Sequence, residues 1–214
     1  MSRSLQTIYE DHHATERAGG FSVLEKDRGE ALRRIVGKEK RVLDIGCRDG
    51  ALTKHFTEGN SVLGVDIDRT ALNRAQNLLS IEGRVVDLNG DWEELKGESF
   101  DVIVAGEILE HLYYPEKVLR RVVKHLNPGG IFVGSVPNAF SLKNRLRYLS
   151  GQKRFTPLED PTHINQFSYA ELISMLQKYF NNAEIIGLGR FRLLSKMFPN
   201  LVAFDLFFIA KNAK

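Results

Sequence analysis

Short apolar runs alternate with segments of helical periodicity along most of the chain. Runs of this length are typical of buried strands, and we expect strands at residues 41–45, 61–67, 84–88, 100–105, 131–136, 183–188 and 203–210. The amphipathic segments predict helices at residues 21–36, 51–57, 69–79, 116–126 and 168–179. Strands that alternate with helices build a mostly parallel sheet with helices on both faces, so the pattern predicts an α/β fold.

The end of the chain departs from this alternation. Phe198, Pro199 and Asn200 predict a turn between the last two strands. A strand pair joined in this way is compatible with an antiparallel edge on a parallel sheet. We therefore expect a mostly parallel seven-stranded sheet with an antiparallel last strand.

Composition narrows the class of protein without naming a function. The 214 residues are enough for one domain, and we treat residues 1–214 as a single domain. The formal net charge is only +3, which by itself is too small to indicate a nucleic-acid partner. Cys47 is the single cysteine, and we find neither a membrane-spanning apolar run nor the apolar core of a signal peptide. We therefore expect a protein of the reducing cytoplasm.

A glycine-rich turn follows the first predicted strand. The sequence RVLDIGCRDG (41–50) leads from a buried strand through glycines into a helical segment, and glycine there lets the backbone approach a ligand closely. The second strand ends in GVDID, where Asp66 lies 22 residues after Asp44 and can accept hydrogen bonds from both ribose hydroxyls. Asp87 ends the third strand. These acids meet at one sheet edge without a basic clamp of the phosphate-loop kind, so they indicate a ligand that is not a polyphosphate.

These motifs, followed in order by FDVIVAGEILEHL and LNPGGIFVGSVPN, resemble the class I S-adenosylmethionine-dependent methyltransferases, in particular their small-molecule O-methyltransferase branch. The resemblance covers residues 42–180 and implies a Rossmann-like methyltransferase fold with S-adenosyl-L-methionine as cofactor. It places Asp44 against the methionine moiety, Asp66 on the ribose and Asp87 on the adenine amino group. The cofactor-binding residues that it implies are Asp44, Gly46, Cys47, Gly50, Asp66, Ile67, Asp87, Leu88 and Glu107.

Arg48 departs from the family pattern, which usually has glycine at this place. If the backbone needs a positive φ there, arginine costs about 1–2 kcal/mol. The side chain could pair with the carboxylate of the cofactor, but we expect it to point to solvent. The departure is also the one hint of an alternative function, a non-catalytic cofactor-binding domain.

Acidic residues and histidines gather after the fourth predicted strand. Glu107, Glu110 and His111 fall on one face if a helix begins there, and His163 precedes the helix predicted at residues 168–179. Together they could bind a divalent cation (Mn, Mg, Co or Zn), although imidazole disfavours Mg. The spacing resembles that of small-RNA terminal 2′-O-methyltransferases and ubiquinone-biosynthesis O-methyltransferases, which use a metal. It also resembles methyltransferases without a metal, with His163 as a base or substrate contact, and both alternatives stay open.

Residues 138–165 form a basic insert without a strand pattern. Leucines at 142, 146 and 149 recur at helical spacing and predict an amphipathic helix. The cations of the insert are Lys143, Arg145, Arg147, Lys153 and Arg154, and Arg190, Arg192 and Lys196 extend its charge. The helix is either a solvated cover over the site or a contact with an anionic partner, such as a lipid surface, a sugar phosphate or RNA. The segment resembles methyltransferases associated with cell-surface glycan assembly.

We expect an enzyme that methylates a hydroxyl of a small molecule or glycan, with His163 or His111 as the base. The alternative enzyme is a metal-dependent O-methyltransferase acting on a quinol or an RNA terminal hydroxyl. Position and family likeness place residues 1–37 as a helical lid over the cofactor, carrying Tyr9 and Arg17. Neither the acceptor nor the oligomeric state follows from the residues.

Overall fold

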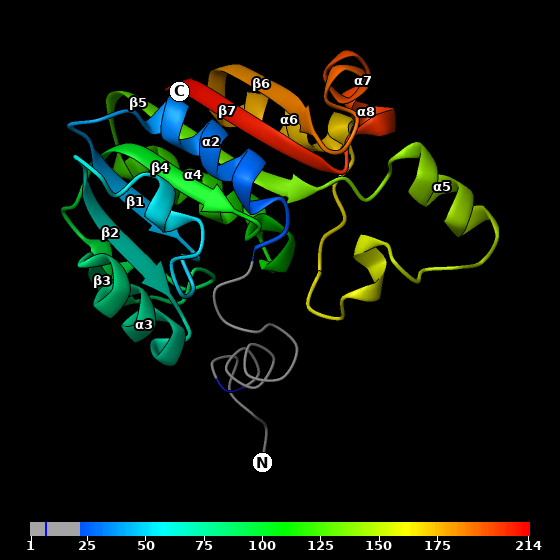
Figure 1. The fold of residues 1–214 in the computed structure, drawn as a ribbon. Helices are drawn as coiled ribbons and strands as arrows, with labels where there is room; N and C mark the ends of the chain where they lie inside the picture. The colour runs from blue at the N-terminus through cyan, green and yellow to red at the C-terminus, as the bar shows by residue number, and fades with distance from the viewer. Residues whose placement is uncertain (1–6, 8–21) are drawn as a thin grey trace.

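A seven-stranded sheet forms the centre of the structure, a computed structural model that describes residue 7 and residues 22–214 (Figure 1). The strands lie in the order β3-β2-β1-β4-β5-β7-β6. Their bounds are β1 (Arg41–Ile45), β2 (Ser61–Asp66), β3 (Glu82–Val85), β4 (Phe100–Gly106), β5 (Leu126–Pro137), β6 (Phe180–Leu188) and β7 (Asp205–Ala213). β7 is antiparallel to both of its neighbours, and the other pairings are parallel. The predicted α/β fold with an antiparallel last strand is confirmed.

Helices cover both faces of the sheet. The helices that the structure describes are α2 (Glu25–Val36), α3 (Arg69–Leu79), α4 (Pro115–His125), α5 (Leu142–Leu149), α6 (Tyr169–Tyr179), α7 (Arg192–Met197) and α8 (Pro199–Val202), and α5 projects beyond the end of the sheet (Figure 1). Side chains alternate between the two faces along a strand. Val42 of β1 therefore joins the apolar layer under α2, whereas Leu43 and Ile45 join the layer under α4 and α6 (Figure 1). Among the residues that the structure describes, no helix combines the length and apolar character needed to cross a bilayer.

Two predicted boundaries near the glycine-rich turn need correction. Residues 51–57 form a 3₁₀ turn at Thr53–His55 and no α-helix, because the amides of His55 and Phe56 donate to the carbonyls three residues earlier, those of Leu52 and Thr53. β3 ends at Val85, so Asp87 lies in the loop beyond the strand. There the Oδ1 atom of Asp87 accepts from the Asn89 amide at 2.9 Å, a turn that stops the strand pairing.

The connection between the last two strands also differs from the prediction. α7 and α8 fill it, and Pro199 starts α8, where no amide hydrogen is needed. β7 inserts between β5 and β6, so β6 and not the last strand forms the edge. Of the predicted lid, Tyr9 and Arg17 lie outside the described residues, whereas α2 packs on the sheet.

The strand order creates the place for a site. The chain leaves β1 toward β2 and β3 on one side and returns to β4 on the other side of β1. The loops that follow β1 and β4 therefore diverge, and a crevice forms beyond the carboxyl ends of these strands.

Candidate active site

A cavity of about 1780 Å³ opens at this crevice. Eight of the nine predicted cofactor-binding residues line it, namely Asp44, Gly46, Cys47, Asp66, Ile67, Asp87, Leu88 and Glu107. Gly50 does not line the cavity; it turns the loop with φ +82°, and an added Cβ would lie 2.6 Å from the Leu79 side chain. We call these eight residues the strand-end wall.

The turn after β1 is held tightly against its neighbours. Gly46 has φ +74°, and a Cβ there would lie 2.7 Å from the Ile108 side chain, so only glycine fits between the two loops. The amides of Gly46 and Cys47 both donate to the Val65 carbonyl of β2, at 2.8 and 3.2 Å. The backbone that faces the cavity is therefore anchored to the sheet.

Asp44 is a buried acid in the cavity wall. The Thr53 hydroxyl donates to its Oδ2 atom at 2.7 Å. Burial raises the pKa of Asp44 from 3.8 to about 7; the Thr53 hydrogen bond opposes this shift, and the charge of Asp66 adds to it. A ligand that brings a positive charge close to Asp44 would favour its ionised form.

Asp66, at the end of β2, is oriented by backbone amides. The Arg48 amide donates to its Oδ2 atom and the Asp68 amide to its Oδ1 atom, each at 2.8 Å. Asp68 in turn caps α3 by accepting from the amides of Thr70 and Ala71, at 2.9 and 3.0 Å. The predicted ribose acid is thus fixed by both loops beside it.

Arg48 adopts the left-handed conformation that glycine usually occupies, with φ +49°. Its guanidinium pairs with Asp49, with the Nε atom 3.2 Å from Oδ1 and Nη2 3.4 Å from Oδ2. The side chain is only 16% exposed. The prediction that Arg48 points to solvent is therefore wrong, because the neighbouring carboxylate holds it against the loop.

Glu107 does not share a helical face with Glu110 and His111, contrary to the prediction. It has φ +58°, and the 3₁₀ turn begins only at Leu109. The Ser135 hydroxyl donates to its Oε1 atom at 3.0 Å, and its own amide donates to the Ser135 carbonyl at 3.0 Å. Glu107 leaves the predicted ligand set because its backbone and its side chain are both bound to β5.

Arg28 of α2 is the main site residue that the sequence analysis missed. It is 2% exposed, and its Nη1 atom lies 3.3 Å from Oε1 of Glu107. Its Nε atom lies 3.7 Å from Oδ2 of Asp205, and its Nη2 atom donates to the Ser22 hydroxyl at 2.8 Å. Its spacing was a signal: it precedes Leu32 by one helical turn, so it lies on the buried face of the helix.

Asp205, at the start of β7, is the buried partner of this arginine. Burial raises the pKa of Asp205 well above its usual range; the charge of Glu107 acts in the same direction, and that of Arg28 opposes it. Burial thus favours the protonated form of Asp205, whereas the guanidinium of Arg28 favours its ionised form.

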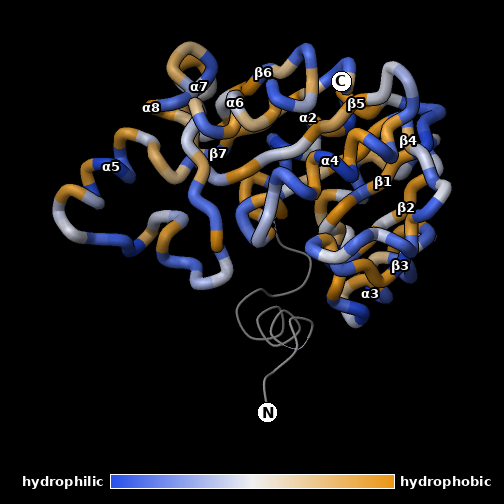
Figure 2. Tube along the Cα trace, turned by 180° about the vertical axis from the view of Figure 1, so that it is seen from behind, coloured by the Kyte–Doolittle hydropathy of each residue, from blue (hydrophilic) through white to orange (hydrophobic). Residues whose placement is uncertain are grey.

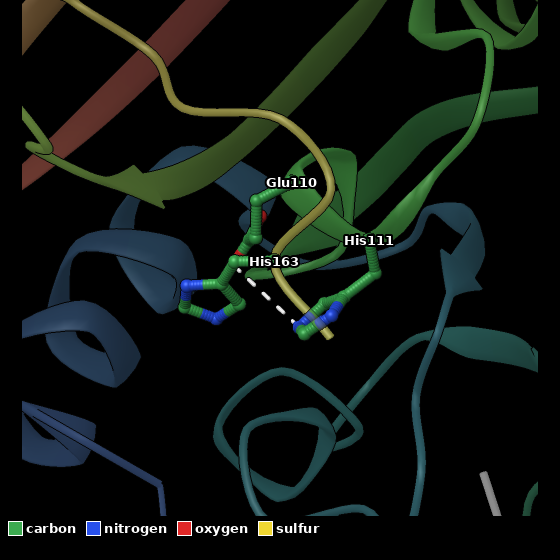
Figure 3. Close-up of side chains that lie close together, drawn as sticks. All are labelled: Glu110, His111 and His163. Atoms are coloured by element: carbon green, nitrogen blue, oxygen red, sulfur yellow. Dashed lines mark ion pairs between the residues drawn. The ribbon is translucent and has the colours of Figure 1, made fainter. Parts of the chain in front are cut away.

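Glu110, His111 and His163 come together at the cavity, as Figure 3 shows. One candidate ligand atom from each lies within 4.8 Å of the others. The Nδ1 atom of His111 lies 2.9 Å from the Thr162 carbonyl, and that of His163 lies 3.0 Å from the Pro157 carbonyl. A carbonyl only accepts, so both Nδ1 atoms carry hydrogen, and both Nε2 atoms present a lone pair when the rings are neutral.

This group has the donors that a divalent cation requires. Two neutral imidazole nitrogens and one carboxylate favour Mn, Fe, Co or Zn, and the ring centroids of the two histidines are 4.8 Å apart. The histidines line the cavity, whereas Glu110 does not line it and is buried. The same Nε2 atoms are placed to accept a proton from a ligand in the cavity.

The sequence profile of a family described as "Methyltransferase domain" matches residues 20–182, which is most of the chain. The chain belongs to this methyltransferase family. S-adenosylmethionine is the cofactor of the class I members, and the predicted family is therefore confirmed.

Named relatives of this methyltransferase include ubiquinone biosynthesis O-methyltransferases. That of Nitrosococcus oceani is 38% identical over 96 residues, covering 42% of this chain and 41% of the relative. That of Ralstonia nicotianae is 38% identical over 100 residues, covering 42% and 40%. The chain thus matches only two fifths of the length of these relatives.

Solved methyltransferase structures share the fold. One from Thermotoga maritima, described as a possible histamine N-methyltransferase, has a TM-score of 0.67 at 16% identity and covers 97% of this chain and 95% of its own. An N-methyltransferase from Bradyrhizobium japonicum in complex with S-adenosylhomocysteine has a TM-score of 0.65 at 17% identity and covers 98% and 99%. These likenesses confirm the Rossmann-like methyltransferase fold.

Replacing Arg28 by methionine should destabilise this methyltransferase by roughly 3–5 kcal/mol at neutral pH, because Glu107 and Asp205 lose their buried countercharge. Arg34→Met, an exposed change on the same helix, should stay within about 0.5 kcal/mol of the wild type. Urea unfolding measures both. Equal stability of the two variants would show that the Arg28 cluster contributes nothing.

Replacing Asp44 by asparagine should change how stability depends on pH. The unfolded chain ionises Asp44 near its ordinary pKa of 3.8, whereas the native state holds the proton up to about pH 7. The stability that this group contributes is fully present below pH 3.8 and is lost as the pH rises through about 7. The free energy of unfolding of the wild type relative to Asp44→Asn should therefore fall by about 1 kcal/mol per pH unit across this window. Urea unfolding at several pH values measures it, and parallel pH profiles would contradict it.

Proposed function

We propose that the chain transfers the methyl group of S-adenosylmethionine to a hydroxyl oxygen of a small molecule or glycan. The observation that carries the proposal is the juxtaposition, in one cavity, of strand-end acids and two histidines with acceptor nitrogens. The names of the O-methyltransferase relatives support oxygen as the acceptor atom. The single buried cysteine, Cys47, is in keeping with the predicted cytoplasmic location.

The strand-end wall is assigned to the cofactor. The carboxylate of Asp66 already accepts hydrogen bonds from two backbone amides, which fix its orientation for further hydrogen bonds from the ribose. Asp87 faces the cavity from its turn and is assigned to the adenine amino group, beside Ile67 and Leu88. Asp44 and Glu107 are assigned to the positively charged methionine end.

The histidine wall is assigned to the acceptor. When bound, S-adenosylmethionine supplies an electrophilic methyl group, and positioning of the attacking oxygen is the main task of the protein. The Nε2 atom of His163 takes the hydroxyl proton, since its Nδ1 hydrogen is held by the Pro157 carbonyl. The Oδ2 atom of Asp160, 3.5 Å from Nε2, stabilises the resulting imidazolium. His111 is the second candidate for the base.

A metal-dependent O-methyltransferase that acts on a quinol or an RNA terminus is the second candidate function. The gathering of Glu110, His111 and His163 favours it, and a cation held there would acidify a hydroxyl that it binds. Glu107, the fourth predicted ligand, is instead paired with Arg28. Arg48, on which the non-catalytic alternative rested, adopts the backbone conformation of the usual glycine and pairs with Asp49.

Replacing Asp66 by alanine should weaken binding of S-adenosylhomocysteine by roughly 1–3 kcal/mol, because the ribose loses a charged acceptor. Isothermal calorimetry measures the affinity, and Asp91→Ala, an exposed acid outside the cavity, is the matched control. Urea unfolding of each variant separates lost binding from lost folding. Unchanged affinity for the cofactor product, or tight binding of NAD, would overturn the cofactor assignment.

Replacing His163 by alanine should lower kcat by roughly 10²- to 10⁴-fold while the affinity for S-adenosylhomocysteine stays unchanged, because the residue lies on the acceptor side. His125→Ala, outside the cavity, is the control. A panel of hydroxyl acceptors assayed for released S-adenosylhomocysteine provides the reaction. A cofactor-binding defect in His163→Ala would contradict the assignment.

Chelator treatment distinguishes the two candidate functions. If the second holds, activity should fall with chelator and return with Mn²⁺ or Co²⁺, and acidification should release the metal because neutral imidazole is the ligand form. If elemental analysis verifies that the metal has been removed and the activity is still full, the metal-dependent function is excluded and the first candidate function stands.

A further inference from the structure

Large apolar side chains are exposed on two segments beside the cavity, residues 142–158 and 190–204, which we call the rim surface. Of the sixteen large hydrophobic residues exposed in the described part of the chain, eleven lie on it. Leu149 of α5 is 84% exposed, Leu193 of α7 72% and Phe155 65%. Figure 2 shows hydrophobic stretches along both segments. Single exposed leucines are ordinary, but a concentration of this kind marks an interaction surface.

The two segments adjoin each other at the cavity. α5 packs against α8, and Figure 1 shows both beyond the same end of the sheet. Leu146 and Phe155 of the first segment and Phe191 and Phe204 of the second line the cavity. Whatever covers the rim surface therefore faces the cavity mouth.

The rim surface is also cationic. It contains eight lysines and arginines and no aspartate or glutamate, although the whole chain has a net charge of only +3, so the remainder is net acidic. Two of its cations lie against an apolar ring: the guanidinium carbons of Arg147 and Arg154 lie 5.6 and 4.9 Å from the centre of the Phe155 ring. Apolar residues interleaved with cations have the composition of a surface that enters a lipid headgroup layer.

We propose that the rim surface docks on a bilayer that contains anionic lipid. Leucines and phenylalanines would enter the interface while lysines and arginines attract the headgroups. A second copy of the chain is a poorer occupant, because a twofold axis would set this cationic patch against itself. RNA is also poorer, because single-stranded RNA is held by stacking on aromatic rings, whereas leucines are prominent among the exposed side chains here.

Docking in this way turns the cavity mouth toward the lipid. The methyl acceptor would then be an amphipathic molecule that reaches the histidines from the bilayer, a consequence that rests on the proposed function. The docking itself stands on the surface alone.

Vesicle flotation tests the proposal. We expect the chain to bind phosphatidylcholine vesicles that contain phosphatidylglycerol at least about tenfold more tightly than pure phosphatidylcholine vesicles, and the difference to shrink as salt is raised. Two variants change exposed positions of the rim surface that do not line the cavity. The apolar variant carries Leu149→Ser and Leu193→Ser and should bind the vesicles about tenfold more weakly than the wild type. The charge variant carries Lys153→Glu, Arg154→Glu and Lys196→Glu and should bind them about 100-fold more weakly.

Matched changes elsewhere on the surface are the controls. They are Leu78→Ser and the triple change Lys38→Glu, Lys96→Glu and Lys124→Glu, all at exposed positions. Leu78→Ser should bind anionic vesicles within about threefold of the wild type. The triple change should bind them far better than the charge variant of the rim surface does. All variants should bind S-adenosylhomocysteine as the wild type does, and calorimetry on each keeps a failure of docking distinct from a failure of the proposed function.

Three outcomes would overturn the proposal. The first is no preference for anionic vesicles. The second is a dimer in light scattering that the apolar variant dissociates while vesicles are not bound, which assigns the surface to a second copy. The third is binding of an RNA oligonucleotide that the charge variant loses while vesicles are not bound.

Discussion

The buried guanidinium of Arg28 is the interaction on which the geometry of the cavity depends. It joins the chain entering α2 at Ser22, the end of β4 at Glu107 and the start of β7 at Asp205. Removing a charge from water is costly unless countercharge and hydrogen bonds replace the water. The carboxyl groups of Glu107 and Asp205 take the place of water around the Arg28 guanidinium. The three elements are therefore fixed to one another at the edge of the cavity.

This constraint accounts for the backbone of Glu107. A left-handed conformation costs a non-glycine residue about 1–2 kcal/mol, and here it is offset by the ion pair with Arg28 and two hydrogen bonds to Ser135. The conformation holds the carboxylate on the side of β5 and sends the chain into the 3₁₀ turn that carries Glu110 and His111. The conformation of Glu107 thus keeps its own carboxylate, which is assigned to the cofactor, apart from the histidines that are assigned to the acceptor.

What the sequence could predict follows from the range of the interactions involved. Strand positions and the acids at their ends were predictable, because burial alternates locally and parallel strands end at one edge. The ion pair between Arg28 and Asp205 joins residues 177 positions apart, and no local pattern links them. The left-handed conformation of Glu107 and the ion pair of Arg48 also depend on the folded arrangement of the loops and not on a local sequence pattern. The shared helical face of Glu107, Glu110 and His111 was wrong for that reason.

The division of the cavity between two parts of the chain has a consequence for specificity. Among the acids of the strand-end wall, Asp44 and Asp66 lie in the last residues of β1 and β2, which the sheet fixes directly, and Asp87 and Glu107 follow β3 and β4 closely. His163 and the cations of α5 instead lie on one connection, between β5 and α6, which stands away from the sheet (Figure 1). The acidic wall attracts a positively charged ligand and the basic rim an anionic one, so the field along the cavity has a direction. On this proposal a change of acceptor leaves the sheet and its acids as they are. By the same proposal, the rigid part of the fold binds the cofactor that the whole family shares, and the loops outside the sheet select what the individual enzyme methylates.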